Sequence, residues 1–312
     1  MVTRTKTYSL SAVIEGYLMS LGARHLSQNT VDDYTRTLHK FATFLVTDPP
    51  VHEITSKHVE QFLASFKDLS NKSLLNYHIG LSALWTWLVR EEIVSENIIR
   101  KLTPPKPTKK EVVPFTEAEV KAMLSALNRS KVYRRDGRNV DHALGSMERN
   151  RAILLLMLDT GLRASELCEL KIEDLDTRNH RIFVRMGKGM KERLLPFSPR
   201  TGQMLWRYLA GRKDTQPGDP LFVGRLNRPI TRTKLAEMCA GIGKRAGVQN
   251  VHPHRFRHTF AIQYLRNGGN AYTLQMMLGH SSFESVRIYL RLAQVDLDTV
   301  HRRASPVDGW RL

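Results

Sequence analysis

The chain has 312 residues and a formal charge of +18, from 48 Lys and Arg against 30 Asp and Glu, and 41% of its residues are hydrophobic. This composition excludes an acidic disordered chain and predicts a polyanionic partner, while the length suits two domains. The longest apolar run, Ile153 to Leu158, is far shorter than the ~20 residues of a membrane span, and no secretory signal follows Met1. Two cysteines are too few for a disulfide scaffold, so the sequence predicts a cytoplasmic protein without a membrane partner.

Charge and prolines together mark a domain boundary. Residues 1–113 carry 14 basic and 11 acidic residues, whereas residues 114–312 carry 34 basic and 19 acidic ones. Between them, Pro104, Pro105, Pro107 and Pro114 block helix and ladder hydrogen bonds, which predicts an extended linker. We therefore expect a first domain over residues 1–103, a linker over 104–114 and a second domain over 115–312.

The first domain is predicted to be a helical bundle. Apolar residues recur there with the spacing of amphipathic helices in four successive segments. Their apolar positions include Leu10 to Leu18, Val31 to Leu45, Val59 to Phe66, and Leu74 to Val89.

The second domain is predicted to be mainly α with a small antiparallel sheet. Thr116 and Glu119 form a capping box that predicts a helix start, and the apolar run from Arg151 to Leu158 predicts another helix. Residues 181–186 alternate like a strand, and residues 192–197 return after a glycine turn, which predicts a β-hairpin. The polar, basic stretch Asn128 to Asn150 is interpreted as a solvated surface loop, with a DNA contact as the alternative.

Arg163 and Glu166 lie where one helix ends and the next begins. Gly161 is a typical helix terminator, so Arg163 would stand at the start of the following helix, where free N–H groups and a guanidinium can face an anion. Glu166 is three residues further along and is placed to hold the arginine. An ordinary surface ion pair is the alternative, and this segment alone favours it.

Lys188 stands between Gly187 and Gly189 at the tip of the predicted hairpin. Such a turn can approach a ligand closely, but glycine-rich turns with lysine are common. No strand–GxxxxGK[ST]–helix pattern surrounds it, which argues against a nucleotide P-loop.

A third motif is the segment His252 to His258. If a helix begins near Pro253, His254 and Arg257 share one face, and a histidine and an arginine that converge suit a phosphate. A metal site through His254 and His258 is the alternative, but Arg255 stands where zinc proteases of this spacing carry glutamate. We therefore expect no metal and no cofactor.

His280 and Tyr289 complete the candidate residues. Gly279 is expected to end a helix, and Ser281 with Glu284 predicts a capping box, which places His280 in a tight corner between helices. Each residue has an ordinary alternative, since this histidine can be structural and a tyrosine on an amphipathic helix usually packs in the core.

Together these positions resemble the tyrosine recombinase family, the lambda-integrase and Xer-type site-specific recombinases. The agreement in order and spacing covers roughly residues 114–312, and the first domain resembles the family's core-binding domain. Phe256 stands where leucine is usual, and the basic insertion before Arg151 is long. The residues that carry the resemblance are Arg163, Lys188, His254, Arg257, His258, His280 and Tyr289.

The resemblance implies a chemistry in which Tyr289 attacks a DNA phosphorus. Arg163 and Arg257 would bind the nonbridging oxygens, and His280 would hydrogen-bond one of them. His254 would take the proton of the phenol, and Lys188 would protonate the leaving 5′-oxygen. Glu166 and His258 would support these groups.

The same resemblance implies a homotetramer on double-stranded DNA with two synapsed recombination sites, exchanged through a Holliday junction without metal or ATP. The enzyme would act in the bacterial cytoplasm at the nucleoid, and an accessory DNA-bending or directionality factor is left open. The tail beyond Tyr289 would dock on a neighbouring protomer, with packing in cis as the alternative. A non-cutting DNA-binding relative and a type IB topoisomerase or telomere resolvase are the competing functional interpretations.

Overall fold

A computed structural model of the chain describes residues 7–24, 26–107, 112–127, 146–185, 192–212, 214–280, 282–293, 301 and 305–310, with the backbone of 133–135 and 138–140. The chain divides into two compact units after Lys110, which lies inside the proline-rich segment. Each unit has its own hydrophobic core. None of the described helices is long and apolar enough to cross a membrane.

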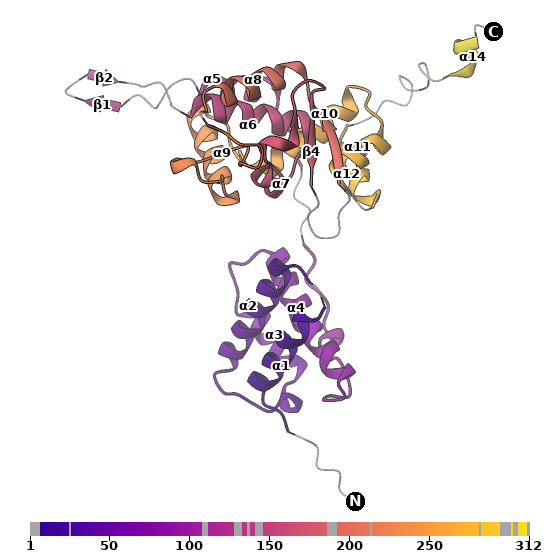
Figure 1. Ribbon diagram of the computed structural model, residues 1–312. Coiled ribbons are helices and arrows are strands. Elements are labelled where there is room, and N and C mark those ends of the chain that lie inside the picture. Colours follow the sequence, from indigo (N-terminus) through magenta and orange to yellow (C-terminus); the bar gives the residue numbers. More distant parts are fainter. Residues whose placement is uncertain are drawn as a thin grey trace, which may run out of the picture. The chain divides into compact units, whose positions relative to one another are not determined.

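The first unit is a helical bundle, and its four predicted helices are confirmed (Figure 1). Serine hydroxyls cap three of them by accepting a backbone N–H from the first turn. The core is rich in aromatic rings, such as Phe41, which packs edge-on against Phe62 and Trp85. The elements are α1 (Leu10–Gly22), α2 (Gln28–Leu45), η1 (Val51–Glu53), α3 (Ser56–Ala64), α4 (Asn71–Arg90) and η2 (Ile98–Lys101).

The second unit is mainly helical with a small sheet, as the sequence predicts (Figure 1). Its first helix begins at the predicted capping box, where Thr116 Oγ1 accepts from Glu119 N and Thr116 N donates to Glu119 Oε2. The helices are α5 (Glu117–Ser125), α6 (Met147–Thr160), α7 (Ala164–Glu169), η3 (Ile172–Asp174), α8 (Pro199–Ala210), η4 (Arg225–Asn227), α9 (Arg232–Ala246), α10 (Pro253–Arg266), α11 (Ala271–Leu278), α12 (Glu284–Ala293) and α14 (Pro306–Trp310).

The predicted hairpin is confirmed as part of a three-stranded antiparallel sheet. Its strands are β3 (Leu175–Asp176), β4 (Arg181–Val184) and β5 (Arg193–Pro196), in that order. In the register of β4 and β5, Ile182 lies opposite Leu195, and both side chains are buried. The hairpin tip, residues 186–191, lies outside the described residues, and Lys188 lies with it.

The basic stretch before α6 contains more regular structure than the loop expected from its polarity. Two short strands, β1 (Tyr133–Arg135) and β2 (Arg138–Val140), pair antiparallel. Three-residue strands of mostly polar side chains lack the apolar alternation that identifies a strand in sequence, so the prediction missed them.

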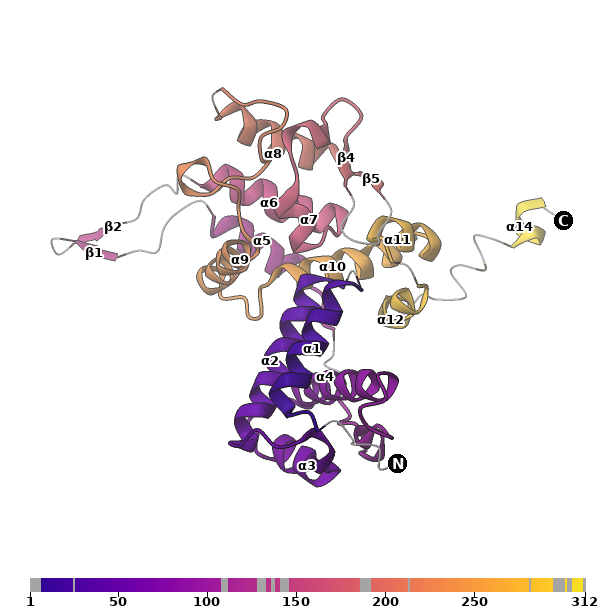
Figure 2. The ribbon, with the colours of Figure 1, turned by 60° about the horizontal axis from the view of Figure 1, so that its bottom comes forward.

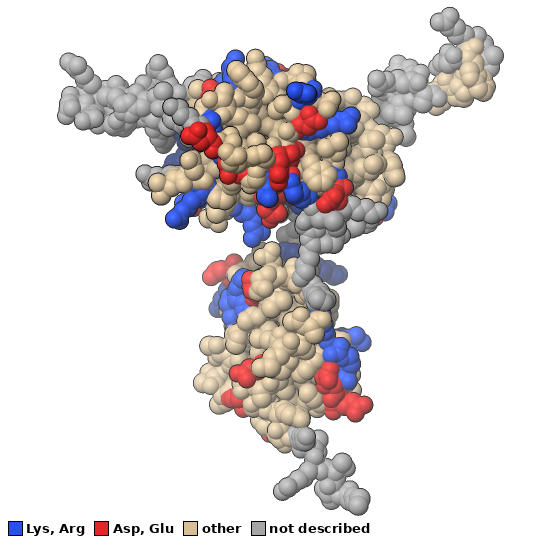
Figure 3. Space-filling model, in the orientation of Figure 1, with Lys and Arg blue, Asp and Glu red and all other residues tan. Residues whose placement is uncertain are grey.

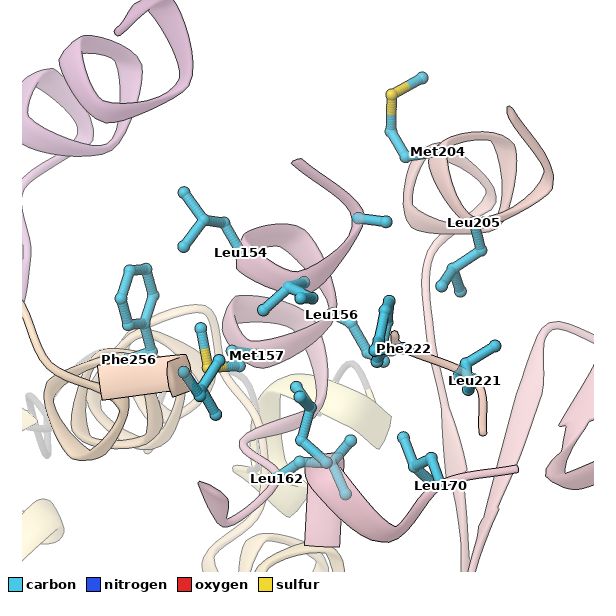
Figure 4. Close-up of a cluster of buried hydrophobic side chains, with 14 of the residues drawn as sticks. Leu154, Leu156, Met157, Leu162, Leu170, Met204, Leu205, Leu221, Phe222 and Phe256 are labelled. Atoms are coloured by element: carbon cyan, nitrogen blue, oxygen red, sulfur yellow. The ribbon is translucent and has the colours of Figure 1, made fainter. Parts of the chain in front are cut away.

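Helix α6 runs through the core of the second unit, and α10 packs against it. Leu156 and Met157 of α6 belong to the same buried cluster as Leu205, Phe222 and Phe256 (Figure 4). Phe260 and Ile262 of α10 belong to a second cluster, formed with α11 and α12. Helix α10 therefore lies between α6 and the pair α11 and α12 (Figure 2), and its polar residues are held between two cores.

Replacing Gly161 by alanine is expected to destabilise the second unit by ~2–4 kcal/mol, because left-handed strain adds to overpacking of the core. Gly161 has φ 63°, and a Cβ there would overlap the ring of Phe260. Gly247 is the matched control, since it also has a left-handed φ of 68° but opens into free space. Chemical unfolding should show a clearly smaller loss for Gly247→Ala, and equal losses would contradict the packing argument.

Candidate active site

The turn between α6 and α7 places Arg163 beside Glu166. Gly161 ends α6 in the left-handed conformation, and Arg163 is the extended N-cap residue of α7. The backbone N–H of Arg163 donates to Oε2 of Glu166 at 2.8 Å, and its Nη1 donates to Oε1 at 2.9 Å. The contact that the spacing predicts is therefore present, and the Arg163 side chain keeps 31% of its surface exposed.

Arg257 of α10 is 2% exposed and joins two helix ends. Its Nη1 donates to the carbonyl of Gly161 at 2.7 Å, and its Nη2 donates to the carbonyl of Leu278 at 2.7 Å. Nη2 also lies 2.9 Å from Nε2 of His280. Because a guanidinium only donates, Nε2 accepts this bond and the neutral ring of His280 carries its proton on Nδ1.

The carboxyl end of α11 gathers three arginines from distant parts of the chain. The last carbonyls of a helix have no partner within it and form the negative end of the helix dipole, so they attract cations. Gly279 ends the helix with φ 63°, which is the predicted terminator. The three contacts are Arg193 Nε to Met277 O (2.8 Å), Arg257 Nη2 to Leu278 O (2.7 Å) and Arg163 Nη2 to Gly279 O (3.3 Å).

Arg193 was not among the residues predicted from sequence. Its side chain is 10% exposed, and its two terminal nitrogens donate to the two oxygens of Glu166 at 3.0 and 2.8 Å. The sequence offered one indication of its role. Arg193 lies on the same face of the strand as buried Leu195, while Leu194 between them points the other way and is 49% exposed. A charge on the buried phase of a strand requires a partner.

Tyr289 of α12 is buried, with its hydroxyl on a histidine. The side chain is 3% exposed and belongs to the cluster formed by α10, α11 and α12. Its hydroxyl lies 2.9 Å from Nδ1 of His258. Tyr289 is therefore buried, as the core-packing alternative predicts. Its hydroxyl nevertheless contacts α10, the helix that carries Arg257.

Two of the predicted histidines lie ring against ring on α10. The centroids of His254 and His258 are 4.1 Å apart, with an angle of 66° between the planes. Sequence analysis assigned the proton of Tyr289 to His254, whereas His258 is the histidine in contact with the hydroxyl. The i, i+4 spacing turns both rings to one side of α10, and the position of α12 decides which of them meets the phenol.

Some of the predicted features lie outside the described residues. Lys188 and Ser281 are among them, so neither the hairpin tip nor the predicted cap of α12 is described. A neighbouring hydroxyl is described, and Ser282 Oγ accepts from the backbone N–H of Glu284 at 3.2 Å. The described residues thus place Arg163, Glu166, Arg193, Arg257, His258, His280 and Tyr289 around the end of α11 and the adjoining faces of α10 and α12.

Comparison with known proteins identifies the family. Residues 115–295 match the phage integrase family, and residues 14–92 match the phage integrase N-terminal SAM-like domain. The chain belongs to the phage integrase family. The tyrosine recombinase XerA of Pyrococcus horikoshii is 31% identical over 301 residues, which cover 96% of this chain and 95% of the relative. The tyrosine recombinase XerC of Bacillus pumilus is 29% identical and covers 91% and 92% of the two chains.

Solved structures share the fold of this tyrosine recombinase at low sequence identity. The Tn1549 transposon integrase in complex with transposon right-end DNA has a TM-score of 0.76 at 20% identity, over 96% of this chain and 99% of that one. A lambda integrase dimer bound to a COC′ core site has a TM-score of 0.73 at 18% identity, over 92% and 79%. The resemblance to this family that the sequence motifs indicate is confirmed.

The site of the recombinase carries more positive than negative charge. Burial acts to raise the pKa of Glu166, but the hydrogen bonds and charges of Arg193 and Arg163 outweigh it, so the net shift is downward and the carboxyl is ionised. Burial, with the charge of Arg163 next, lowers the pKa of Arg257 to about 10, which still leaves the guanidinium charged at neutral pH. The site thus holds three guanidiniums and one carboxylate, and the excess positive charge suits an oxyanion.

Burial, together with the same positive charge, keeps the histidines neutral. Burial lowers the pKa of His258 to about 4, with His254 as the next cause, and burial lowers the pKa of His280 to about 4, helped by Arg257. The pKa of His254 is also lowered, first by burial and then by Arg257. Neutral imidazoles can accept a proton, which imidazolium ions cannot.

Metal-ligand geometry singles out no other site among the described residues, and neither does charge on the face drawn in Figure 3. Within the described ranges, no group of three His, Cys, Asp or Glu side chains could hold a metal ion. On the face of residues 111–312 drawn in Figure 3, basic and acidic side chains are intermixed. The local excess of arginine around α11 is therefore a better indication of an anion-binding site than the net charge of the chain.

Proposed function

We propose that this recombinase cleaves and rejoins duplex DNA at a specific site through a 3′-phosphotyrosyl intermediate on Tyr289. The observation that carries the proposal is the meeting of Arg163 and Arg257 at the end of α11, next to the helix that bears the tyrosine. Two guanidiniums at one point suit a single phosphate, and a phenol nearby supplies a nucleophile. The Tn1549 and lambda integrases are bound to DNA in their structures, which supports the same partner here.

The arginines stabilise the charge that develops during attack. As the Tyr289 oxygen bonds to phosphorus, the five-coordinate phosphorane gains negative charge on its nonbridging oxygens, and Arg163 and Arg257 donate N–H groups to them. The bond to the 5′-oxygen then breaks, leaving a 3′-phosphotyrosyl ester and a free 5′-hydroxyl. Because the ester retains the bond energy, the reverse attack rejoins a strand without ATP or metal.

The proton of the phenol passes to a neutral histidine of α10. Burial raises the pKa of Tyr289 while Arg257 and Arg163 act to lower it, so the hydroxyl starts protonated at neutral pH. We assign its proton to His258, which lies 2.9 Å away, and a role at the phosphate to His254 beside it. His280 has a buried Nδ1 without a hydrogen-bond partner among the described residues, and this N–H would serve a nonbridging oxygen. Since the hydroxyl is buried, attack includes a shift of α12 against α10.

Replacing Lys188 by alanine is expected to slow strand cleavage strongly on ordinary DNA and only slightly on DNA with a 5′-thio leaving group. A general acid contributes about 100-fold to 10,000-fold where the leaving group needs a proton, and a thiolate departs without one. Single-turnover cleavage of both substrates measures the difference. Lys191→Ala is the control on the same hairpin, and equal slowing of both substrates by Lys188→Ala would remove lysine from the acid role.

Exchange between two duplexes requires four such sites, so we propose a homotetramer on two synapsed DNA sites and a Holliday-junction intermediate. The tail would join the protomers by docking in trans. Val307 and Trp310 of α14 are 54% and 72% exposed, which leaves apolar surface for a neighbouring copy to cover. We place this activity at the bacterial nucleoid and leave an accessory DNA-bending factor open.

Covalent trapping on a randomised duplex DNA pool tests the proposed function. The full chain is incubated with the pool and denatured in detergent, and the DNA that remains attached is sequenced. We expect attached 3′ ends that share one sequence, without added metal or nucleotide. Binding without any adduct would favour a non-cutting relative, and adducts at unrelated sequences with relaxation of any plasmid would favour a topoisomerase.

A further inference from the structure

Arg193 connects strand β5 with Glu166 and with the end of α11, and its side chain is less exposed than that of Arg163. It begins β5, directly after the hairpin tip that carries Lys188. Its Nη1 and Nη2 bind both oxygens of Glu166, and its Nε binds the carbonyl of Met277. All three groups of the guanidinium are therefore engaged inside the protein.

We propose that Arg193 is a positioning residue that keeps Glu166 from neutralising the phosphate-binding Arg163. Each Glu166 oxygen is shared, because Oε1 accepts from both guanidiniums, and Oε2 accepts from Arg193 and the backbone N–H of Arg163. This division lets the carboxylate orient the Arg163 side chain through a single bond, that of Nη1, while Nη2 of Arg163 donates to the carbonyl of Gly279. The inference rests on the proposed function, since it assumes that Arg163 binds the scissile phosphate.

The charge balance gives the reason. The side chain of Glu166 is 10% exposed, and a carboxylate with so little solvent must find compensating donors. Without Arg193, Arg163 is the guanidinium among the described residues that still donates to Glu166, and a bidentate pair with a carboxylate is the arrangement that arginine prefers. Arg163 would then turn toward Glu166 and lose the charge that it offers to a phosphate. The hydrogen bond from Arg193 Nε to the Met277 carbonyl keeps Arg193 itself at a fixed position beside Glu166.

The test measures three quantities on the randomised duplex pool, namely the single-turnover rate of covalent adduct formation, the DNA affinity and the melting temperature. In Arg193→Met we expect the rate to fall about 10-fold or more with little change in affinity, as for residues coupled in one network. Arg255→Met is the matched control, because Arg255 also pairs with a carboxylate, Glu119, and with backbone carbonyls, away from α11. It should lower the melting temperature while leaving the rate near that of the unmodified protein.

Two further variants separate positioning from simple support of the fold. Glu166→Gln removes the charge that would capture Arg163, so the double variant Arg193→Met, Glu166→Gln should be faster than the product of the two single effects predicts. Arg193→Lys should be intermediate, since one ammonium cannot hold both oxygens and the Met277 carbonyl together. If Arg193→Met unfolds, Arg193→Lys decides, and a rate equal to that of the unmodified protein would overturn the proposal.

Additive single and double effects, or equal rates in Arg193→Met and Arg255→Met, would also overturn it. Tyr289→Phe is measured in parallel to separate this inference from the proposed function. Adduct formation by Tyr289→Phe defeats the proposed function itself. An inactive Tyr289→Phe beside a fully active Arg193→Met defeats only the inference about Arg193.

Discussion

Tyr289→Phe is expected to form no covalent protein–DNA adduct while binding DNA almost as tightly as the unmodified chain. The substitution removes the oxygen that would bond to phosphorus, and no other group can replace it in the phosphotyrosyl ester. Phosphate contacts by lysine and arginine supply most of the affinity of such proteins, and they do not depend on the phenol. The fold should persist, because the lost bond to His258 contributes only about 1 kcal/mol.

Tyr264→Phe is the matched control for this experiment. Tyr264 lies on α10, and its hydroxyl also makes one hydrogen bond, 2.9 Å from Oγ1 of Thr273. The variant loses a hydroxyl of the same kind from the same domain and should retain adduct formation. Denaturing gels of both variants with labelled DNA give the comparison, and a labelled adduct in Tyr289→Phe would disprove the nucleophile assignment.

Arg257→Lys is expected to slow adduct formation by about 100-fold to 1,000-fold, the cost of removing one preorganised donor from an oxyanion site. The lysine keeps the charge but cannot reach Gly161, Leu278 and His280 at once, as the guanidinium does. A buried carbonyl left without a donor costs ~1–3 kcal/mol, so the melting temperature should also fall. Rate and melting temperature are therefore measured together.

Arg212→Lys separates the loss of stability from the loss of chemistry. Arg212 also donates to two backbone carbonyls, those of Pro220 and Leu221, and none of its described contacts is with the site. This variant should lose stability and keep its cleavage rate. A rate for Arg257→Lys close to that of the unmodified chain would show that the buried arginine supports the fold and does not serve the phosphate.

Local features of the site were accessible from the sequence because their geometry depends on neighbouring residues. A glycine two residues before Arg163 and a glutamate three residues after it place the ion pair by helix geometry alone. The same holds for the capping box at Thr116 and for the glycine that ends α11. Contacts between residues far apart in the chain were not accessible in this way.

The assignment of the histidines illustrates the difference. His254 and His258 lie one helical turn apart on the same side of α10. No local sequence rule decides which of the two rings contacts Tyr289 on α12. The packing of α12 against the cluster of Phe260 and Leu274 sets that contact, and it selects His258. Arg193 was missed for a related reason, since its partners Glu166 and Met277 are 27 and 84 residues away.

Apolar periodicity and helix caps were enough to predict two domains and a mainly helical fold with one small sheet, and the order of a few polar motifs indicated the recombinase family by resemblance. These features depend on contacts within a few residues, which the chain order specifies directly. The convergence of three arginines on the end of α11, and the burial of Tyr289 against His258, arose only from packing. They depend on how separate helices and a strand fit together around shared cores, and local patterns do not encode that fit.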